Sequence, residues 1–404
     1  YLLEQHHDLD GLTLESLRFE SLGTDNIGFL SETYLVKLKY EQRDGIRENR
    51  MLIAALEDKE NEKPPPPSTL VLKCAGHFDE HFRKLAEETN CYEKEHLFYT
   101  KIAPELSKAR DLDDGSANAN ERVHMRVPLV YRSELVTPNG DSEKVSYILM
   151  EDLSATCEMG NQVRGLAPER AEQLVRALAT LHASFWEGRE GALEIPDFVL
   201  RGDADAGLFE KLRSDFDRTY PKLVASRGYK PFNKNIPEEY VMDVMRRLYH
   251  NSYTILEHMC NGMPQTLIHC DFRADNIMLH KNDPKGSVVL DWQMYCRGGG
   301  VYDVCNILVA SMTVTDRREH CTRLLKLYYD CLLDQGVLGY SWESLVHDFR
   351  ASCLQLSLIT SCLASGVDDN GDAKPDWGGT DLFSACLERF CIAIYDYNCL
   401  DLLD

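Results

Sequence analysis

Fourteen cysteines occur in the 404-residue sequence, but no two of them form a C-x-x-C pair. The spacing therefore excludes the zinc ribbons and the dithiol redox motifs that depend on such pairs. Several cysteines lie in apolar, helix-like segments, for example Cys353 between Ser352 and Leu354. Disulfide frameworks are typical of small secreted chains. We therefore expect reduced thiols and a cytoplasmic protein.

Long apolar segments are also missing. No run approaches the roughly 20 apolar residues that a membrane-spanning helix requires, so we expect no membrane span. The first residues lack the basic segment and the apolar core of a signal peptide. Because the sequence starts at Tyr1 rather than Met, it leaves open whether a leader was removed.

Basic residues are scarce relative to acidic ones. The 44 lysines and arginines stand against 66 aspartates and glutamates, which gives a formal net charge of −22. Nucleic acids and anionic membranes require clustered Lys and Arg, so we expect neither as the main partner. The acidic excess would suit a cationic substrate, or it serves only solubility. The composition leaves both alternatives open, and it leaves the oligomeric state unknown.

The secondary-structure pattern changes near Asp152. Before it, alternating and short apolar runs predict strands, with one helix and an exposed loop at the four prolines Pro64–Pro67. After it, three- and four-residue spacing predicts helices, the clearest from Pro168 to Trp186. We therefore predict an α+β protein with a small β-rich lobe, residues 1–150, and a larger, mainly helical lobe, residues 151–404. The predicted strands lie within 17–40, 69–73, 127–132 and 145–150, and the other predicted helices cover 82–102, 236–259, 316–335, 341–365 and 380–400.

Carboxylate and amide side chains form the strongest chemical signal. The segment His269–Asn276 separates Asp271 from Asn276 by four residues, and an apolar strand that follows ends in Asp291. Phosphoryl transfer needs a carboxylate that orients the attacking hydroxyl, and oxygen ligands that hold Mg²⁺ against the nucleotide phosphates. Mg²⁺ usually binds through one or two carboxylates together with phosphate and water. The pattern therefore favours a phosphotransferase over two unrelated acidic turns.

These segments resemble the catalytic loop and metal-binding strand of the aminoglycoside phosphotransferase and choline-kinase-like superfamily, which commonly read H-G-D-x-x-x-x-N and D-W or D-F. The resemblance implies a protein-kinase-like, two-lobed fold, with Asp271 as catalytic base and Asn276 and Asp291 as Mg²⁺ ligands. Cys270 replaces the usual Gly and puts the loop geometry in doubt. The D-F-R-x-D-N and D-W-Q variants look nearest to the ecdysteroid-kinase-like (CHK kinase-like) and hydroxyacyl-kinase-like branches.

Further motifs of this superfamily follow in the expected order, and the resemblance covers about Gly23 to Asp303. Lys73 ends an apolar strand, and by resemblance it binds nucleotide phosphates and pairs with a helix glutamate. Glu95 lies in an E-x-x-F-Y segment and is the expected partner, with Glu93 as the fallback. Without the other motifs, a lysine at the end of a strand is more often a solvent-exposed residue than a phosphate ligand.

Two other segments resemble nucleotide-binding elements. Tyr147–Leu153 is similar to the lobe-connecting hinge, in which backbone groups of Met150 and Glu151 would lie close to the adenine. The alternative interpretation of this segment is a buried strand that ends in a polar turn, without a role in nucleotide binding. The turn around Gly28 is similar to a phosphate-covering loop, but it lacks G-x-G-x-x-G spacing, and an ordinary hairpin fits nearly as well.

Three further polar residues carry specific expectations. Arg273 would contact the transferring phosphate as a catalytic residue, or it is a structural or solvated arginine. Asp303 looks like the family aspartate that braces the catalytic loop through its backbone. His182 lies on the apolar face of its helix in an L-H-x-x-F-W segment, so we predict a hydrogen-bonded core histidine rather than a ligand.

These residues and the resemblance predict an enzyme that uses ATP and Mg²⁺ to phosphorylate an alcohol group of a small molecule. The acceptor stays open, because sugars, amino alcohols, steroids, hydroxy acids and aminoglycosides are all acceptors in this superfamily, and fold does not choose among them. The main alternative is a nucleotide-binding pseudokinase, whose usual mark is loss of the base or the metal aspartate. A protein kinase is disfavoured, since no D-F-G or A-P-E segment follows Asp291.

Overall fold

The computed structural model describes residues 12–22, 31–42, 64–75, 86–87, 89–111, 122–136, 145–199, 214, 237–364 and 380–404. The chain divides into two compact units. The first unit contains Tyr1–Pro104 and Pro128–Ala155, and the second contains Glu105–Val127 and Thr156–Asp404. The roles predicted for residues 1–150 and 151–404 stay predictions.

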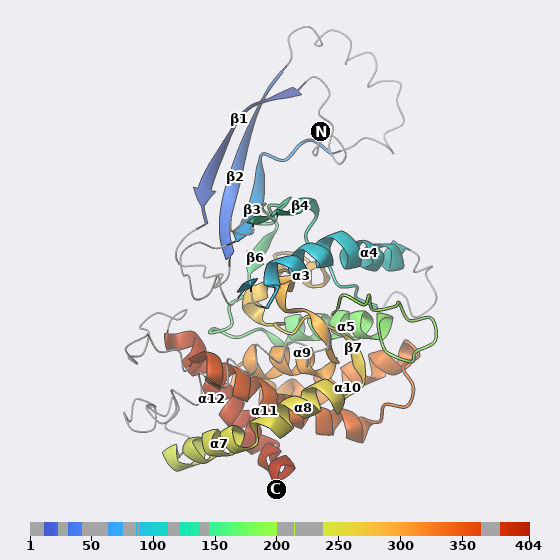
Figure 1. The fold of residues 1–404 in the computed structure, drawn as a ribbon, viewed down its shortest axis with the longest axis vertical. Coiled ribbons are helices and arrows are strands. Elements are labelled where there is room, and N and C mark those ends of the chain that lie inside the picture. Colours follow the sequence, from blue (N-terminus) through green and yellow to red (C-terminus); the bar gives the residue numbers. More distant parts are fainter. Residues whose placement is uncertain are drawn as a thin grey trace. The chain divides into compact units, whose positions relative to one another are not determined.

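The first unit is built on a five-stranded antiparallel sheet in the order β1-β2-β3-β5-β4 (Figure 1). Side chains alternate between the two faces of a strand, so β2 buries Val36 while its neighbour Lys37 is exposed. Val36 packs with Leu70 and Tyr131 in a small core cluster. The strands are β1 (Leu12–Ser21), β2 (Ser31–Gln42), β3 (Thr69–Ala75), β4 (Val130–Val136) and β5 (Val145–Glu151).

One helical stretch follows the third strand. Helix α3 (Cys91–Leu97) lies against β4 and β5, and it continues through the π-helical segment η3 (Phe98–Ile102) into α4 (Ala103–Asp111). Phe98 and Ile102 are fully buried, so this stretch presents an apolar face. The helix predicted over 82–102 is confirmed for the described residues from 91 onward.

The second unit is mainly helical (Figure 1). Helix α5 starts with Pro168 in its first turn, where the missing N–H has no intrahelical partner to lose. It packs against α10, and α11 packs against α7, α8, α9 and α12. The helical elements are α5 (Pro168–Ser184), α7 (Glu238–His250), α8 (Ser252–Asn261), α9 (Val301–Cys305), η8 (Asn306–Ala310), α10 (Val314–Asp334), α11 (Trp342–Ala364), α12 (Thr380–Asp396) and η9 (Cys399–Leu403).

The single helix predicted over 236–259 is wrong in one respect, because two helices replace it. Helix α7 ends at His250 and α8 begins at Ser252. Between them, the side-chain amide of Asn251 donates a hydrogen bond to the carbonyl of Arg247. Asparagine competes in this way for backbone groups that a continuous helix would use. The apolar periodicity continues across the break, so the pattern alone did not reveal it.

Two small sheets carry the loops of the second unit. Strand β7 (Gln265–Ile268) pairs antiparallel with β10 (Cys296–Gly299). The other sheet has the order β6-β8-β9, with β6 (Cys157–Met159), β8 (Ile277–His280) and β9 (Val288–Val289). The predicted catalytic loop leaves β7 and, through the short helix η5 (Ala274–Asn276), enters β8. The remaining short helices are η6 (Pro284–Gly286) and η7 (Trp292–Met294).

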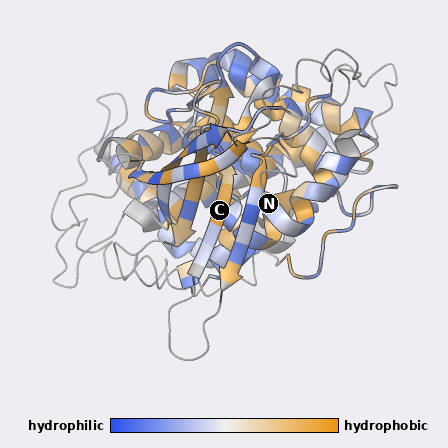
Figure 2. Ribbon diagram, turned by 90° about the horizontal axis from the view of Figure 1, so that it is seen from above, coloured by the Kyte–Doolittle hydropathy of each residue, from blue (hydrophilic) through white to orange (hydrophobic). Residues whose placement is uncertain are grey.

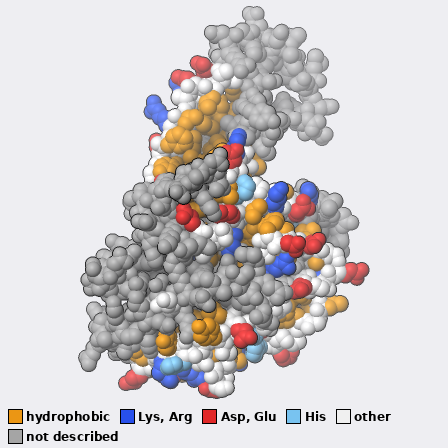
Figure 3. Space-filling model, viewed as in Figure 1, with side chains coloured by type: hydrophobic (Ala, Val, Ile, Leu, Met, Phe, Trp, Pro, Cys, Tyr) orange, Lys and Arg blue, Asp and Glu red, His pale blue; other side chains and the backbone are white. Residues whose placement is uncertain are grey.

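Hydrophobic and hydrophilic residues alternate along the strands and helices (Figure 2), as amphipathic elements require. Some apolar side chains of β1 stay exposed, among them Leu14, Leu17 and Phe19, and Figure 3 shows hydrophobic atoms gathered over β1 and β2. In the part of the chain that the structure describes, twelve cysteines carry reduced thiols.

None of the helices that the structure describes is long and apolar enough to cross a membrane.

Candidate active site

Lys73 and Glu95 meet in the first unit as the sequence predicts. The Lys73 Nζ atom lies 2.8 Å from Glu95 Oε1 and 2.7 Å from Oε2, so the ammonium group contacts both carboxylate oxygens. The side chains are 13% and 4% exposed. Strand β3 and helix α3 thus hold a largely buried ion pair. These distances favour Glu95 over the fallback Glu93, whereas the binding of phosphates by Lys73 stays a prediction.

The predicted hinge residues lie at the end of an inner strand of the sheet. In β5, Met150 is buried and opposite Val71 of β3, and Glu151 follows it. The Glu151 N–H donates to the carbonyl of Leu129 at 2.9 Å, and the Glu151 Oε1 accepts from the Leu129 N–H at 2.8 Å. An adenine contact of Glu151 would therefore have to use its carbonyl. The predicted phosphate-loop residue Gly28 lies outside the described residues.

Asp303 of α9 braces the predicted catalytic loop through its backbone, as expected from the resemblance. Its Oδ2 accepts from the His269 N–H at 2.7 Å and its Oδ1 from the Cys270 N–H at 3.0 Å. Asp303 is fully buried. Both carboxylate oxygens thus fix the first two residues of the loop, which directly precede Asp271.

His269 joins the loop to the strand that leads to Asp291, a role that sequence reasoning missed. Its Nδ1 accepts from the Asp271 N–H at 3.2 Å, and its Nε2 lies 2.9 Å from the Leu290 carbonyl. A backbone amide can only donate, so Nδ1 carries no proton and the Nε2–H donates to Leu290. The buried ring packs on Trp292 with centroids 4.6 Å apart. The sequence signal for this role was the position of His269 in the H-x-D motif.

Cys270 has a left-handed backbone with φ 69°. Glycine adopts this conformation readily, whereas side chains with a Cβ atom are disfavoured there. Cys270 therefore occupies a backbone conformation that would suit the superfamily's usual Gly, and the cysteine is strained there. Asp291 is also left-handed, with φ 63°, although Asp tolerates this region better than most residues.

The Asp271 carboxylate is anchored through one oxygen. Its Oδ2 accepts from Asn276 Nδ2 at 2.8 Å and from Arg273 Nε at 3.2 Å. The side chain is 34% exposed, so the carboxylate is accessible to solvent. Among the described residues, no side chain or backbone group hydrogen-bonds to Oδ1, so this oxygen can accept from a bound hydroxyl.

Arg273 is held by carboxylates and is not a solvated arginine. Besides Asp271, its guanidinium contacts Asp275 Oδ2 at 2.9 Å. Burial lowers the pKa of Arg273, but the negative charges of Asp271, Asp275 and Asp291 outweigh burial and raise it. Three carboxylates therefore act on one guanidinium, and their excess negative charge suits a cation. This geometry favours the structural alternative for Arg273, and its contact with a phosphate stays a prediction.

The predicted metal ligands lie on neighbouring segments and have the right donor chemistry. Leu290, just before Asp291, donates its N–H to the Asn276 carbonyl at 2.9 Å. Because the Asn276 side-chain nitrogen donates to Asp271, its Oδ1 is the atom that could bind a metal. Asp291 contributes a carboxylate that accepts from Gln293 Nε2 at 3.3 Å. An amide oxygen and a carboxylate are hard ligands that fit Mg²⁺.

A family model described as "Ecdysteroid kinase-like family" matches residues 28–337, which is more than three-quarters of the chain. The chain belongs to the Ecdysteroid kinase-like family. It thus has the protein-kinase-like fold of the aminoglycoside phosphotransferase and choline-kinase-like superfamily, an antiparallel sheet followed by a mostly helical region.

Comparisons with individual proteins give lower similarity. An uncharacterized kinase-like protein of Caenorhabditis elegans is 27% identical over 207 residues, and the match spans 50% of this chain and 50% of that protein. A choline kinase from Cryptosporidium parvum superposes with a TM-score of 0.46 at 11% identity, covering 96% of this chain and 92% of that one. For a Plasmodium vivax ethanolamine kinase the TM-score is 0.41 at 12% identity, with 93% and 83% covered.

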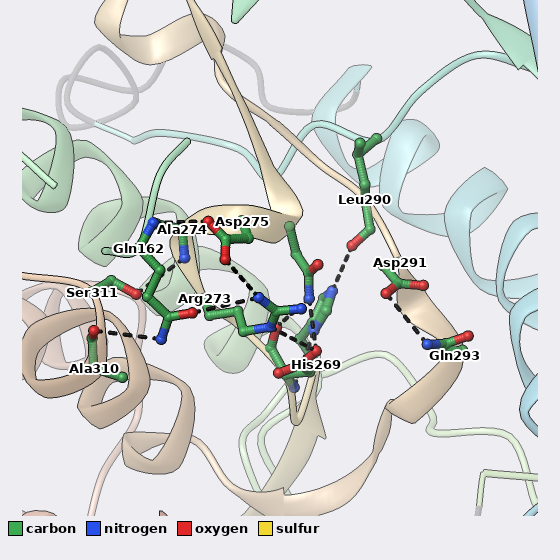
Figure 4. Close-up of polar contacts among 12 residues, drawn as sticks. Gln162, His269, Arg273, Ala274, Asp275, Leu290, Asp291, Gln293, Ala310 and Ser311 are labelled. Carbon is green, nitrogen blue, oxygen red and sulfur yellow. Dashed lines mark hydrogen bonds and ion pairs between the residues drawn. The ribbon is translucent and has the colours of Figure 1, made fainter. Parts of the chain in front are cut away.

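In this Ecdysteroid kinase-like protein, a second layer of residues that sequence reasoning missed supports the loop. The Gln162 N–H donates to Asp275 Oδ1 at 2.8 Å, and the Gln162 Oε1 lies 3.4 Å from Arg273 (Figure 4). The Ser311 hydroxyl accepts from the Ala274 N–H at 3.0 Å. Gly160 lies so close that a Cβ atom there would sit 2.2 Å from the Ala274 carbonyl oxygen. No local motif identifies these residues.

Helix α12, which lies beyond the residues that the family model matches, also supports the loop. The Arg389 guanidinium donates to the carbonyls of Gln162 and Ala310, both at 2.6 Å, and of Val163 at 2.9 Å. Burial lowers the pKa of Arg389, yet a guanidinium remains charged, so its donors stay available. Residues 162 and 389 are 227 positions apart, and the sequence offers no signal that would pair them.

His182 is a core histidine of this kinase-like protein, as predicted. Its Nδ1 lies 2.8 Å from the Tyr328 hydroxyl, and its Nε2 lies 3.5 Å from Asp303 Oδ2. The His182 and Asp303 side chains are fully buried. The Thr266 hydroxyl of β7 donates to the His182 carbonyl at 2.7 Å. His182 therefore ties α5 and α10 to the aspartate that braces the predicted catalytic loop.

Proposed function

We propose that this protein transfers the γ-phosphoryl group of ATP to an alcohol group of a small molecule. The observation that carries the proposal is the anchored Asp271 carboxylate. One of its oxygens is held by Asn276 and Arg273, and the side chain is accessible on a loop whose backbone is fixed by Asp303. Such preorganisation is what positioning a hydroxyl for phosphoryl transfer requires.

In this proposal Asp271 accepts the proton of the acceptor hydroxyl through Oδ1. The donors on Oδ2 restrict rotation of the carboxylate, so the second oxygen is presented in one orientation. As the O–H bond breaks, the hydroxyl oxygen forms its bond to the γ-phosphorus, and ADP leaves. Arg273 keeps the carboxylate in place rather than reacting itself.

Asn276 Oδ1 and the Asp291 carboxylate are the proposed Mg²⁺ ligands. Bound Mg²⁺ would neutralise charge on the nucleotide phosphates. Lys73 is the proposed phosphate ligand of the first unit, held in one rotamer by both oxygens of Glu95. The backbone of Met150 and the carbonyl of Glu151 are the proposed adenine contacts, and Gly28 the proposed glycine of a phosphate-covering turn.

The acceptor is proposed only as a small-molecule alcohol. Both the base and the metal aspartate are present in the chain, so the mark of a pseudokinase is missing.

The proposal is tested by measuring ADP release from Mg-ATP against a panel of sugars, amino alcohols, hydroxy acids and steroids. We expect acceptor-dependent ADP release that disappears in Asp271→Asn. In parallel, the melting temperature should rise with Mg-ATP, because binding to the folded state at a hundredfold excess over Kd stabilises it by about 2.7 kcal/mol.

The two measurements separate the alternatives. A melting temperature that ignores millimolar Mg-ATP would contradict nucleotide binding and with it the whole proposal. A Mg-ATP-dependent shift without ADP release for any acceptor of the panel would favour the pseudokinase. ADP release that persists in Asp271→Asn would remove Asp271 from the role of base.

A further inference from the structure

Two histidines and an aspartate meet between helices α8 and α11, in a part of the second unit that the proposed phosphoryl transfer does not use. His258 lies on α8, and His347 and Asp348 lie on α11. One potential metal-binding atom from each residue lies within 4.8 Å of the others. Asp348 is buried, His258 is half-buried, and His347 is half exposed to solvent, so an ion could enter from the surface.

The distances between these atoms match those between ligands on a small metal ion. Asp348 Oδ1 lies 3.4 Å from His258 Nε2 and 3.2 Å from His347 Nδ1. Zinc binds histidine nitrogen and carboxylate oxygen at about 2.0–2.2 Å in tetrahedral geometry, so two of its ligand atoms lie about 3.3–3.5 Å apart. The separation between His258 and Asp348 therefore equals the edge of a zinc tetrahedron. The separation between His347 and Asp348, which is also a hydrogen bond, is slightly shorter than that edge.

The His258 ring provides an independent observation. Its Nε2 atom is buried, yet it makes no hydrogen bond with any residue that the structure describes. At 3.4 Å from Asp348 Oδ1 the nitrogen is near enough for an ion pair, but it is not aligned for a hydrogen bond. A buried nitrogen without a partner is unfavourable, and a metal ion between the two atoms would provide one.

Neighbouring residues hold the three side chains in place. The Tyr340 hydroxyl donates to Asp348 Oδ2 at 2.9 Å, so the other oxygen, Oδ1, faces the histidines. A hydrogen bond from a neighbouring residue to a ligand side chain orients that ligand toward the metal. At the end of α8, a Cβ atom on Gly262 would lie 2.2 Å from His258 Nδ1. The glycine therefore leaves the space that the His258 ring occupies.

We propose that His258, His347 and Asp348 bind a zinc ion that links α8 to α11, with water in the remaining position. Imidazole nitrogens favour zinc over Mg²⁺, which distinguishes this site from the proposed nucleotide site. His258 binds through Nε2, and His347 through Nδ1 with its proton on Nε2. Since α8 leads into β7 and the catalytic loop, the ion would fix the helix that precedes this loop.

Zinc binding to the full chain tests the proposal without any measurement of turnover. The EDTA-treated protein is equilibrated with zinc, freed of unbound metal by gel filtration, and its zinc content is determined. We expect about one zinc per chain that is lost in His258→Gln and in His347→Gln, with Kd raised about 10²-fold or more in each. His320→Gln is the matched control, because His320 lies on α10 outside the cluster and should leave zinc binding unchanged.

The fourteen cysteines could also bind zinc, so cobalt is used as a spectroscopic probe. A nitrogen and oxygen site gives cobalt ligand-field bands without thiolate charge-transfer absorption, and we expect this spectrum only while both histidines are present. A thiolate spectrum, or equal zinc binding by the wild type and both cluster variants, would overturn the proposal, as would a wild type without bound zinc. If His258→Gln does not fold, the zinc content of His347→Gln tests the proposal, because this half-exposed residue can be replaced without disturbing the core.

Discussion

The two units hold their key charges in different ways. In the first unit, one lysine on a strand and one glutamate on a helix form a direct ion pair. In the second unit, Asp271 lies on a loop whose position depends on α9, on the end of β9, on residues beside β6 and on α12. The strand and the helix that carry Lys73 and Glu95 fix the geometry of the ion pair. The geometry of the loop, in contrast, depends on residues that are far apart in the chain.

The largest expected effect lies within the second unit. Asp271→Asn should lower kcat by about 10²–10⁴-fold, the usual contribution of a positioned general base, while Mg-ATP affinity stays nearly unchanged. Asp291→Asn should weaken Mg-ATP binding as well as turnover, because an amide is a poorer Mg²⁺ ligand. Calorimetry of ATP binding alongside kcat checks both. Equal loss of ATP binding in the two variants would show that the roles of base and metal ligand are not divided this way.

The ion pair of the first unit should be the next most sensitive. Lys73→Met removes the cation beside the Glu95 carboxylate, which is 4% exposed, and should destabilise the protein by about 3–5 kcal/mol. Adding Glu95→Leu should restore much of that stability. Urea unfolding measures both. The control is Lys37→Met, which breaks an exposed pair with Glu20 on the same sheet and should change stability by at most about 1 kcal/mol. Equal effects of both lysine variants would contradict the importance of burial.

The distant support of the catalytic loop should have a smaller effect. Arg389→Met removes the donor of three carbonyl hydrogen bonds, and we expect a loss of about 1.5–3 kcal/mol. Turnover should fall while nucleotide affinity holds, because Gln162 would no longer position Arg273. Arg350→Met is the control, since Arg350 of α11 donates to the Asn398 carbonyl and does not reach the loop. A kcat that changes equally in both variants would show that α12 acts only on stability.

The smallest expected effect is at Cys270. Cys270→Gly should relieve a left-handed conformation worth about 1–2 kcal/mol, but the more flexible unfolded chain offsets about 0.4–1 kcal/mol of this gain. Cys270→Ala keeps a Cβ atom and should gain nothing. Comparing the free energies of unfolding of the two variants in urea measures the cost of the left-handed backbone separately from the loss of the thiol. If alanine stabilises as much as glycine, the strain at φ 69° is not the cause.

The sequence predicted the local features of the site well. Lys73 and Glu95 could be paired because each lies in a short motif on its own strand or helix. The Asp303 brace could be expected from its resemblance to the family aspartate that follows the predicted metal-binding strand. Asn276 stays a predicted ligand, and its amide contact with Asp271 depends on the turn of η5, which the spacing does not specify.

The rest could not be predicted, because it depends on contacts that no short window contains. Gln162 and Arg389 support the loop although neither belongs to a motif. His269 was visible in the motif, but its bond to the Leu290 carbonyl requires β7 and β9 to be placed in space. At Asn251 the apolar periodicity continues through a point where the helix ends, because a side-chain hydrogen bond outweighs the pattern.

Arg389 lies 52 residues beyond the last position that the family model matches. A shortened protein that ends at residue 337 would keep every predicted catalytic residue and yet lose this guanidinium. The carbonyls of Gln162, Val163 and Ala310 would then lose the cation that holds them together. Protein engineering that keeps only the matched range would thus remove part of the structure that supports the predicted catalytic loop.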